Sequence, residues 1–286
     1  MAITLGTNTT SYVARMSLNS TTNKLSNSMQ RIATGLKINK AGDDAAGLVI
    51  SENMKAYIRS SKQAMANIQN AQAYLTVADD GMVAIADHFQ RINDLLTSMA
   101  NDTNDEDSRK ASLNEINERL NEIDRLAAST NFNGRTMLDG KSGTIVVQMG
   151  PDATDNSTLE ISDALSNCHL SALGAELIDE LDPTSESYKL DGESCRKYMK
   201  VIQDAINKLS TQRGLLGAYE SRMESSYNSL TTRIESLESA RSLYTDTDIA
   251  EAATDMIQQQ ILQQLNTSIL ASANSLQSIA LSLLGG

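Results

Sequence analysis

A long series of hydrophobic residues at strict helical spacing dominates the C-terminal half of the chain. Between residues 199 and 244, steps alternating between three and four residues lead from one member to the next. The stripe consists of Met199, Ile202, Ile206, Leu209, Arg213, Leu216, Glu220, Met223, Tyr227, Leu230, Ile234, Leu237, Arg241 and Tyr244. A 3.5-residue period held over several heptads is typical of a helix that supercoils around a partner. The pattern therefore predicts that another part of the chain lies along this helix.

The first half of the chain carries two further stripes of nearly the same period. One runs from residue 44 to about residue 100, with a phase slip around residues 78–82. After a polar break at residues 101–107 comes a shorter stripe, formed by Leu113, Ile116, Leu120, Ile123 and Leu126. It ends before Asn133-Gly134, a turn dipeptide. Three such helices can cover one another's stripes as a bundle.

Residues 134–192 have a different character. They hold six of the fifteen glycines and both prolines. Residues 144–149 are the best strand candidate, and residues 158–161 are a plausible partner strand. This segment is expected to form a small β-containing cap.

The two ends of the chain carry opposite charges. Residues 1–42 contain bases and no acid, and residues 245–286 contain acids and no base. The acids suit helix capping, with Asp248 and Glu251 resembling a capping box. If the two ends of the chain pair in antiparallel fashion, the opposite charges also lie near one another. Helix capping and charge pairing are compatible explanations of the acids. The expected pairing involves Arg31, Lys37 and Lys40 on one side and Asp246, Asp248, Glu251 and Asp255 on the other.

Each end also carries a narrow apolar stripe. At the front these residues are Leu25, Met29, Ile32 and Leu36. At the back they are Leu262, Leu265, Ile269, Leu276, Ile279 and Leu283. Each end is therefore an amphipathic helix whose seam is too thin to be stable alone.

Together these patterns predict a mainly α protein: a long antiparallel coiled coil or three-helix bundle, a small β-containing cap and paired terminal helices. The expected segments are 1–42 and 245–286 for the two halves of an inner helical domain, and 43–140 and 192–244 for the bundle. The cap occupies residues 141–191.

Composition narrows the range of functions. A formal charge of −12 argues against nucleic acid or anionic lipid as a partner, and no apolar run of about 18 residues spans a membrane. The first residues lack the pattern of a secretory signal. Cys168 and Cys195 could form a disulfide or stay as thiols. His88 and His169 are isolated, and no catalytic motif, metal-ligand cluster or cofactor loop is found, so neither an enzyme nor a cofactor is expected.

Several motifs resemble those of bacterial flagellins. Residues 29–39 (MQRIATGLKIN), 43–48 (DDAAGL) and 50–52 (ISE) resemble the family's N-terminal signature. Residues 90–95 (QRINDL), 119–125 (RLNEIDR) and 132–134 (FNG) resemble its next helices and turn, and 246–251 (DTDIAE) with the apolar end resembles its C-terminus. The motifs fall in the same order over residues 1–140 and 190–286. The chain is similar to a short flagellin with little or no outer variable domain.

This resemblance implies a secreted structural subunit that polymerises into the extracellular flagellar filament and serves motility. It implies export in unfolded form by the flagellar type III apparatus with a chaperone, and contacts with filament cap and junction proteins. The terminal helices would order only on assembly. The alternatives are a hook–filament junction protein, a non-polymerising coiled-coil adhesin, and a monomer whose arms fold onto the bundle.

The resemblance also implies that a host Toll-like receptor binds the first bundle helix and its neighbour. The matching positions are Gln90, Arg91, Leu95 and Glu115. Arg91 and Glu115 could equally be ordinary surface charges, and such pairs contribute little to stability.

Overall fold

A computed structural model describes residues 8–141, 143–161, 165, 167–178 and 180–284, with side chains described up to residue 276. The chain divides into two compact units, Arg59–Ile234 and the combination of Met1–Ile58 with Glu235–Gly286. Within the described residues, no helix combines the length and the apolar character needed to cross a bilayer.

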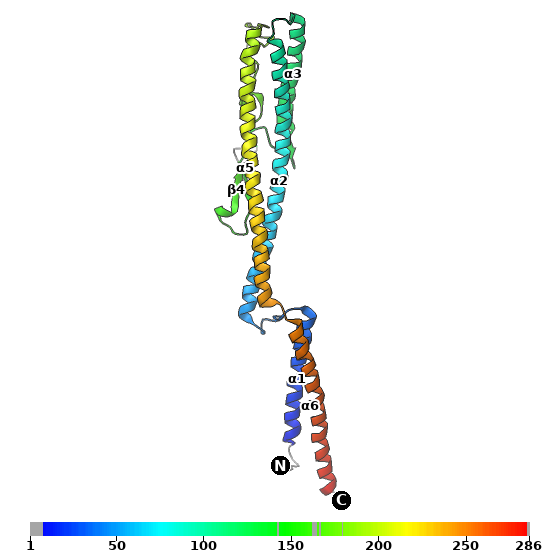
Figure 1. Ribbon diagram of the computed structural model, residues 1–286. Coiled ribbons are helices and arrows are strands. Elements are labelled where there is room, and N and C mark those ends of the chain that lie inside the picture. Colours follow the sequence, from blue (N-terminus) through cyan, green and yellow to red (C-terminus); the bar gives the residue numbers. More distant parts are fainter. Residues whose placement is uncertain (1–7, 142, 162–164, 166, 179, 285–286) are drawn as a thin grey trace. The chain divides into compact units, whose positions relative to one another are not determined.

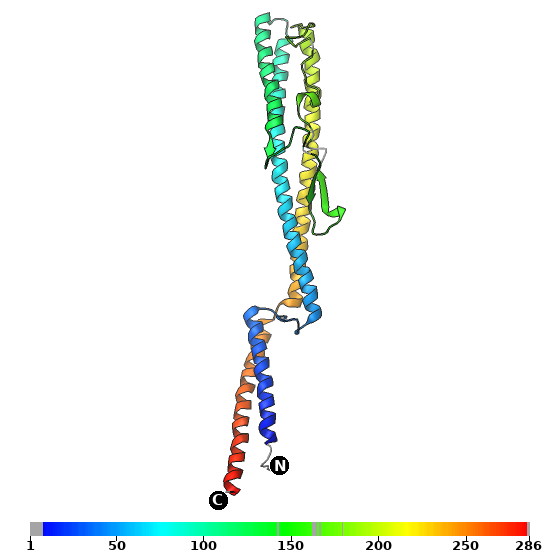
Figure 2. The same ribbon diagram turned by 180° about the vertical axis from the view of Figure 1, so that it is seen from behind.

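The unit Arg59–Ile234 is a three-helix bundle. It contains most of α2 (Ala45–Met99), α3 (Glu106–Ser129) and most of α5 (Gly192–Thr245), which lie side by side in both views (Figures 1 and 2). One continuous core joins them, and its largest fully buried side chains include Ile68, Phe89, Ile116 and Tyr198. The 3.5-residue stripes predicted from the sequence are the residues that fill this core, so the predicted fold class is confirmed.

Arg213, a charged member of the α5 stripe, contacts α2 at the point where the α2 stripe changes phase, residues 78–82. Ala78 and Met82, on either side of the slip in α2, are both fully buried. Between them, Asp79 accepts hydrogen bonds from Arg213 at 2.7 Å (Nε) and 3.2 Å (Nη2). This two-pronged geometry suits a guanidinium and a carboxylate, and it raises the pKa of Arg213. The arginine within the α5 stripe therefore has its partner on α2.

The described residues between α3 and α5 contain two small antiparallel sheets. β1 (Asn131–Phe132) and β2 (Arg135–Thr136) are joined by Asn133-Gly134, both at positive φ, as a tight hairpin turn requires. β3 (Ile145–Gln148) pairs with β4 (Thr158–Ile161), so that Ile145 faces Ile161 across the ladder. A single 3₁₀ turn, η1 (Asp155–Ser157), precedes β4. The two longer strands agree with the sequence prediction.

The short helix α4 (Leu170–Leu173) is held on the bundle by polar contacts. The Asp124 carboxylate on α3 accepts the Leu170 N–H at 3.0 Å and lies 3.1 Å from His169 Nδ1. The buried Tyr198 hydroxyl donates to the Ala175 carbonyl at 3.0 Å, and burial raises the pKa of Tyr198. These contacts attach α4 and the residues on either side of it to α3 and α5.

Both cysteines are buried, and neither forms a disulfide. Burial raises the pKa of Cys168 to about 12 and also raises that of Cys195. The Cys168 thiol donates to Gln212 Oε1 at 3.3 Å. Of the two options left open by the sequence, the structure contains thiols rather than a disulfide.

The other unit pairs the ends of the chain. α1 (Thr9–Thr34) and α6 (Ile249–Leu284) run alongside one another as an antiparallel pair (Figures 1 and 2). The turn from α1 into α2 and the C-terminal end of α5 belong to the same unit. This unit contains most of the residues that the sequence analysis singled out.

Candidate functional site

Short polar side chains and one glycine define the ends of the paired helices. The Asn8 side chain caps α1 by accepting the Ser11 N–H at 2.9 Å. Gly35 ends α1 at φ +71°, a left-handed conformation that favours glycine. Asp248 Oδ1 accepts the N–H groups of Ala250 at 2.8 Å and Glu251 at 3.2 Å. Asp248 therefore caps α6, which is one half of the capping box expected from the sequence.

Main-chain hydrogen bonds join the segment just after α1 to the end of α5 and the link into α6. Lys37 N donates to the Thr245 carbonyl at 2.7 Å, and Thr247 N donates to the Gly35 carbonyl at 3.0 Å. These bonds flank an isolated antiparallel bridge between Leu36 and Asp246. The oppositely charged segments are thus brought together by backbone.

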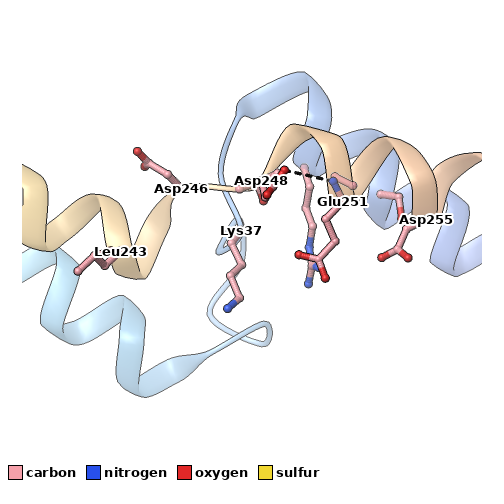
Figure 3. A pocket seen from close by; sticks show the side chains of 10 residues that line it. Lys37, Leu243, Asp246, Asp248, Glu251 and Asp255 are labelled. Carbon is pink, nitrogen blue, oxygen red and sulfur yellow. Dashed lines mark hydrogen bonds between the residues drawn. The ribbon is translucent and has the colours of Figure 1, made fainter.

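A pocket of about 310 Å³ lies where the charges converge. Its lining includes Arg31, Lys37, Asp246, Asp248, Glu251 and Asp255, whereas Lys40 is not part of it. Figure 3 shows the Glu251 and Asp255 carboxylates on the same side as Lys37, with the Asp246 carboxylate pointing the other way. Among these described side chains, no cation and carboxylate come within 4 Å of one another. The charges are neighbours across solvent rather than ion pairs.

The Asp246 carboxylate is held by hydroxyl groups. Ser242 Oγ donates to it at 2.7 Å and Thr245 Oγ1 at 2.9 Å. These two bonds, with a smaller contribution from the Arg241 charge, lower the pKa of Asp246. Elsewhere in the described part of the chain, no three His, Cys, Asp or Glu side chains gather as a metal ion would require. The pocket therefore offers electrostatic attraction and no recognisable reaction chemistry.

The Asp43-Asp44 dipeptide shapes the turn into α2. Asp43 Oδ2 accepts the N–H groups of Asn39 at 3.0 Å and Lys40 at 2.9 Å, and these bonds lower the pKa of Asp43. Their contribution to stability is present above the ordinary Asp pKa and is lost as the pH falls through the lowered pKa. Asp44 Oδ1 accepts the Gly47 N–H at 2.9 Å and caps α2.

Position 47 has no room for a side chain, which explains the glycine there. A Cβ added there would overlap the Asp44 carboxylate and approach Ile38 Cδ1 to 2.8 Å. Ile38 is itself buried. The motif at residues 43–48 is therefore a compact turn in which each acid accepts main-chain hydrogen bonds and the glycine leaves room for the cap.

The apolar stripes of the terminal helices are largely exposed. On α1, Leu25 is buried, Ile32 half-buried and Met29 exposed, and Leu36, just after the helix, is also exposed. On α6, all four described members of the predicted seam are exposed: Leu262 by 37%, Leu265 by 53%, Ile269 by 50% and Leu276 by 59%. Ile279 and Leu283 lie outside the residues whose side chains the structure describes.

Other exposed apolar residues extend this surface. Ile257 and Ile261 on α6 are each 53% exposed. Tyr12, Val13 and Met16 are exposed on α1. The sequence analysis did not include these five. The i, i+4 spacing of residues 257, 261 and 265 was the available signal for the first two.

The residues singled out for receptor contact lie on α2 and α3. Arg91 Nε donates to Glu115 Oε1 at 3.1 Å, and Gln90 beside it is exposed. Hydrogen bonds from Arg119 and then from Arg91 lower the pKa of Glu115. Leu95 is only 8% exposed and belongs to the bundle core. The structure therefore joins Arg91 and Glu115 on the surface, exposes Gln90 and buries Leu95.

Neither histidine belongs to a catalytic arrangement. His88 Nδ1 lies 3.4 Å from Arg119 Nη1, and His169 Nδ1 contacts Asp124. Cys168, adjacent to His169 in sequence, is buried and hydrogen-bonded to Gln212 instead. A nucleophile and a base within reach of each other are therefore not formed by these side chains.

Comparison with known proteins gives two family matches. The model of the bacterial flagellin N-terminal helical region matches residues 5–143, and that of the C-terminal helical region matches residues 199–284. The chain is 32% identical to the flagellar filament 33 kDa core protein of Treponema phagedenis, over 97% of this chain and 98% of that protein. It is also 32% identical to a flagellin of Halalkalibacterium halodurans, over 90% of each chain.

A solved structure of a putative flagellar hook-associated protein from Vibrio parahaemolyticus superposes with a TM-score of 0.59. It is 12% identical and covers 71% of this chain and 99% of that one. This match concerns the fold alone.

We predict that Gly47→Ala destabilises the turn into α2 by about 1–3 kcal/mol, because the added methyl group displaces the Asp44 cap or the buried Ile38. Amide hydrogen exchange of residues 38–50 measures this as faster opening. Gly42→Ala is the matched control, since a Cβ there meets nothing within 4 Å. Equal exchange in both variants would contradict the steric explanation.

Proposed function

The chain belongs to the bacterial flagellin family and is a structural subunit of the flagellar filament, and on this basis we propose that the exposed apolar face of α6 forms contacts between copies. This face, hereafter the α6 strip, consists of Ile257, Ile261, Leu262, Leu265, Ile269 and Leu276. Its contiguous exposure on one helix is the observation that carries the proposal.

The α6 strip points away from the partner helix within the chain. The α6 residues that are buried or half-buried against α1 include Ala252, Asn266 and Ala273. At 100° per residue, the strip is centred roughly 130° around the helix from that contact face. Tyr12, Val13 and Met16 likewise lie opposite the α1 contact face. The pair therefore presents apolar side chains outward on both helices, where only another molecule can cover them.

The interior of the pair is too small to hold the helices together strongly. Among the side chains that the structure describes, its buried apolar residues are Ala14, Leu25, Ala252 and Ala273, and Leu18, Ile32, Met256 and Leu270 are half-buried. Ordering the backbone costs about 1–2 kcal/mol per residue, and burial of these side chains offsets little of it. We propose that α1 and α6 order on assembly, when the α6 strip gains neighbours. Contacts that repeat without closing generate a filament.

The same weakness suits passage through an export channel. Helices that depend on neighbours for stability can be kept unfolded at little cost before assembly. The resemblance noted from the sequence supplies the partners that we propose for that stage: the flagellar export apparatus and a chaperone. Filament cap and junction proteins are proposed partners at the ends of the polymer.

A second function, binding to a host Toll-like receptor, is proposed on the α2–α3 surface. The sequence resemblance supplies the receptor class. The support in the fold is that Arg91 on α2 and Glu115 on α3 are joined directly at the surface, and that Gln90 is also exposed. Leu95 lies in the core and would act by supporting this surface from beneath.

We predict that replacing Leu262, Leu265 and Ile269 by Gln together prevents filament growth or raises the critical concentration more than tenfold. Each side chain loses an apolar burial of about 1.5–3 kcal/mol in the polymer. Electron microscopy and sedimentation of the purified subunit measure the effect. The control replaces the same three residues by Met, which keeps the surface apolar. Normal filament yield from the Gln variant would refute the assignment of the α6 strip.

We expect the two units of the unassembled subunit to differ in their rates of amide hydrogen exchange. In dilute solution, residues 9–34 and 249–276 should exchange rapidly, whereas the core amides of α2 and α3 should be protected. In filaments both sets should be protected. Slow exchange of α1 and α6 in the isolated subunit would show that the pair is stable without neighbours.

We predict that Arg91→Ala weakens binding of the purified receptor ectodomain about tenfold, a loss common for a central interface arginine. Arg125→Ala is the matched control, because Arg125 is also exposed on the bundle and paired with a glutamate, Glu122, at 2.6 Å. Surface plasmon resonance measures both. The same affinity for Arg91→Ala and the unaltered chain would reject the receptor proposal.

A further inference from the structure

The contact face between α1 and α6 is crossed by hydrogen bonds between polar side chains. Three of these bonds join two side chains, and one joins a side chain to a carbonyl. They connect Asn8 Nδ2 with the Ala273 carbonyl (3.0 Å), Ser11 Oγ with Asn274 Oδ1 (3.0 Å), Asn266 Nδ2 with Thr21 Oγ1 (3.1 Å) and Gln263 Nε2 with Thr22 Oγ1 (3.3 Å). We call these four contacts the polar ladder.

The two threonines of the ladder are fixed as acceptors. Thr21 Oγ1 donates its hydrogen to the Ser17 carbonyl at 2.8 Å, one turn back in α1. Thr22 Oγ1 does the same to the Leu18 carbonyl at 2.9 Å. With the hydroxyl hydrogens engaged, each oxygen can only accept across the pair, so the α6 amides must approach with their N–H groups. The helix thereby imposes a direction on the contact.

Asn8 joins the N-terminus of α1 to α6. Its side-chain oxygen accepts the Ser11 N–H as the helix cap, and its amide donates to the Ala273 carbonyl. Ala273 is itself buried on the contact face. One side chain therefore both starts α1 and binds the partner helix.

The ladder runs in antiparallel order, since residues 8 and 11 at the start of α1 meet residues 273 and 274, whereas residues 21 and 22 meet residues 266 and 263. A slip of one helical turn would break all four contacts. The buried apolar residues discriminate less, because Ala14, Ala252 and Ala273 are small and alike. In helix pairs, polar residues inside a contact face are the best-attested determinants of register.

We propose that the polar ladder sets the register of the α1–α6 pair, with Thr21 and Thr22 as the residues that determine its specificity. Hydrogen bonds supply the alignment inside the pair, whereas most of the α6 strip lies outside the contact face. The proposal concerns pairing within one chain. It does not depend on which contacts the α6 strip makes with other copies.

The test replaces Thr21 and Thr22 by Val, which keeps the branched shape and removes both acceptors. Register is read in assembled filaments from intrachain disulfides, in a Cys168→Ala/Cys195→Ala background. Ser11→Cys with Asn274→Cys reports the native register. Ser11→Cys with Leu270→Cys and Arg15→Cys with Asn274→Cys report slips of one turn in either direction.

We expect the Val variant to lower the ratio of in-register to slipped product roughly fivefold or more, about the factor that one net hydrogen bond contributes. The matched control is Thr9→Val/Thr10→Val, the same change at two exposed α1 positions outside the ladder. Thr21→Ser/Thr22→Ser keeps the hydroxyl groups and should restore the native ratio. Both of these variants are expected to behave as the unaltered chain does.

An unchanged ratio in the Val variant, or an equal loss in the Thr9/Thr10 control, overturns the proposal. If the Val variant forms no filaments alone, it is copolymerised with an excess of unaltered subunits, and only its own cysteines report. In that lattice, in-register product at the unaltered ratio likewise overturns the proposal, and excess slipped product supports it.

Discussion

An apolar stripe on a helix has to be covered by something, and this chain covers its stripes in two different ways. In the unit Arg59–Ile234 the stripes of α2, α3 and α5 face one another, and residues such as Phe89 and Ile116 have no exposed surface. In the paired terminal helices several large apolar residues, including Leu265 and Ile269, remain half exposed. The first unit has a core of its own. The second has a surface that a polymer of identical copies can turn into a core.

The terminal pair places polar side chains across its contact face and leaves several large apolar side chains exposed. Coiled coils place apolar residues inside and polar residues outside. Here Thr21 and Asn266 meet across the contact face, whereas the α6 strip points outward. Hydrogen bonds contribute little net stability but depend strongly on geometry. An interior of this kind aligns the two helices while leaving them weakly held, which is compatible with a chain that must be unfolded before it is assembled.

Most of the architecture could be predicted from the sequence because it depends on long periodic patterns. The stripe from residue 199 to 244 predicted α5, and the strand candidates at residues 144–149 and 158–161 correspond to β3 and β4. The two-residue strands β1 and β2 and the single turn of α4 are too short to have a period. Their positions depend on tertiary contacts, such as the Asp124 carboxylate that accepts from Leu170. Leu95 shows the limit for the receptor surface, since a motif match does not say which side of a helix a residue occupies.

The charged residues of the candidate site could be predicted from the sequence, but the way in which they are brought together could not. Opposite charges on the two ends suggested that the ends meet, and Arg31 and Lys37 do share a pocket with four carboxylates. Lys40 does not line it, and backbone bonds from Lys37 and Thr247 make the connection. The polar ladder went unnoticed because Ser, Thr, Asn and Gln in these arms follow no period that distinguishes the contact face from the solvent face.

The concealed thiols have a practical consequence for anyone who handles this protein. With Cys168 and Cys195 both buried and their pKa values raised, little thiolate is available at neutral pH to react with oxygen or with alkylating reagents. A maleimide dye added to the native chain would therefore leave it almost unlabelled. A single new cysteine on the outer face of a helix would then be the one attachment point for fluorescence imaging of growing polymers.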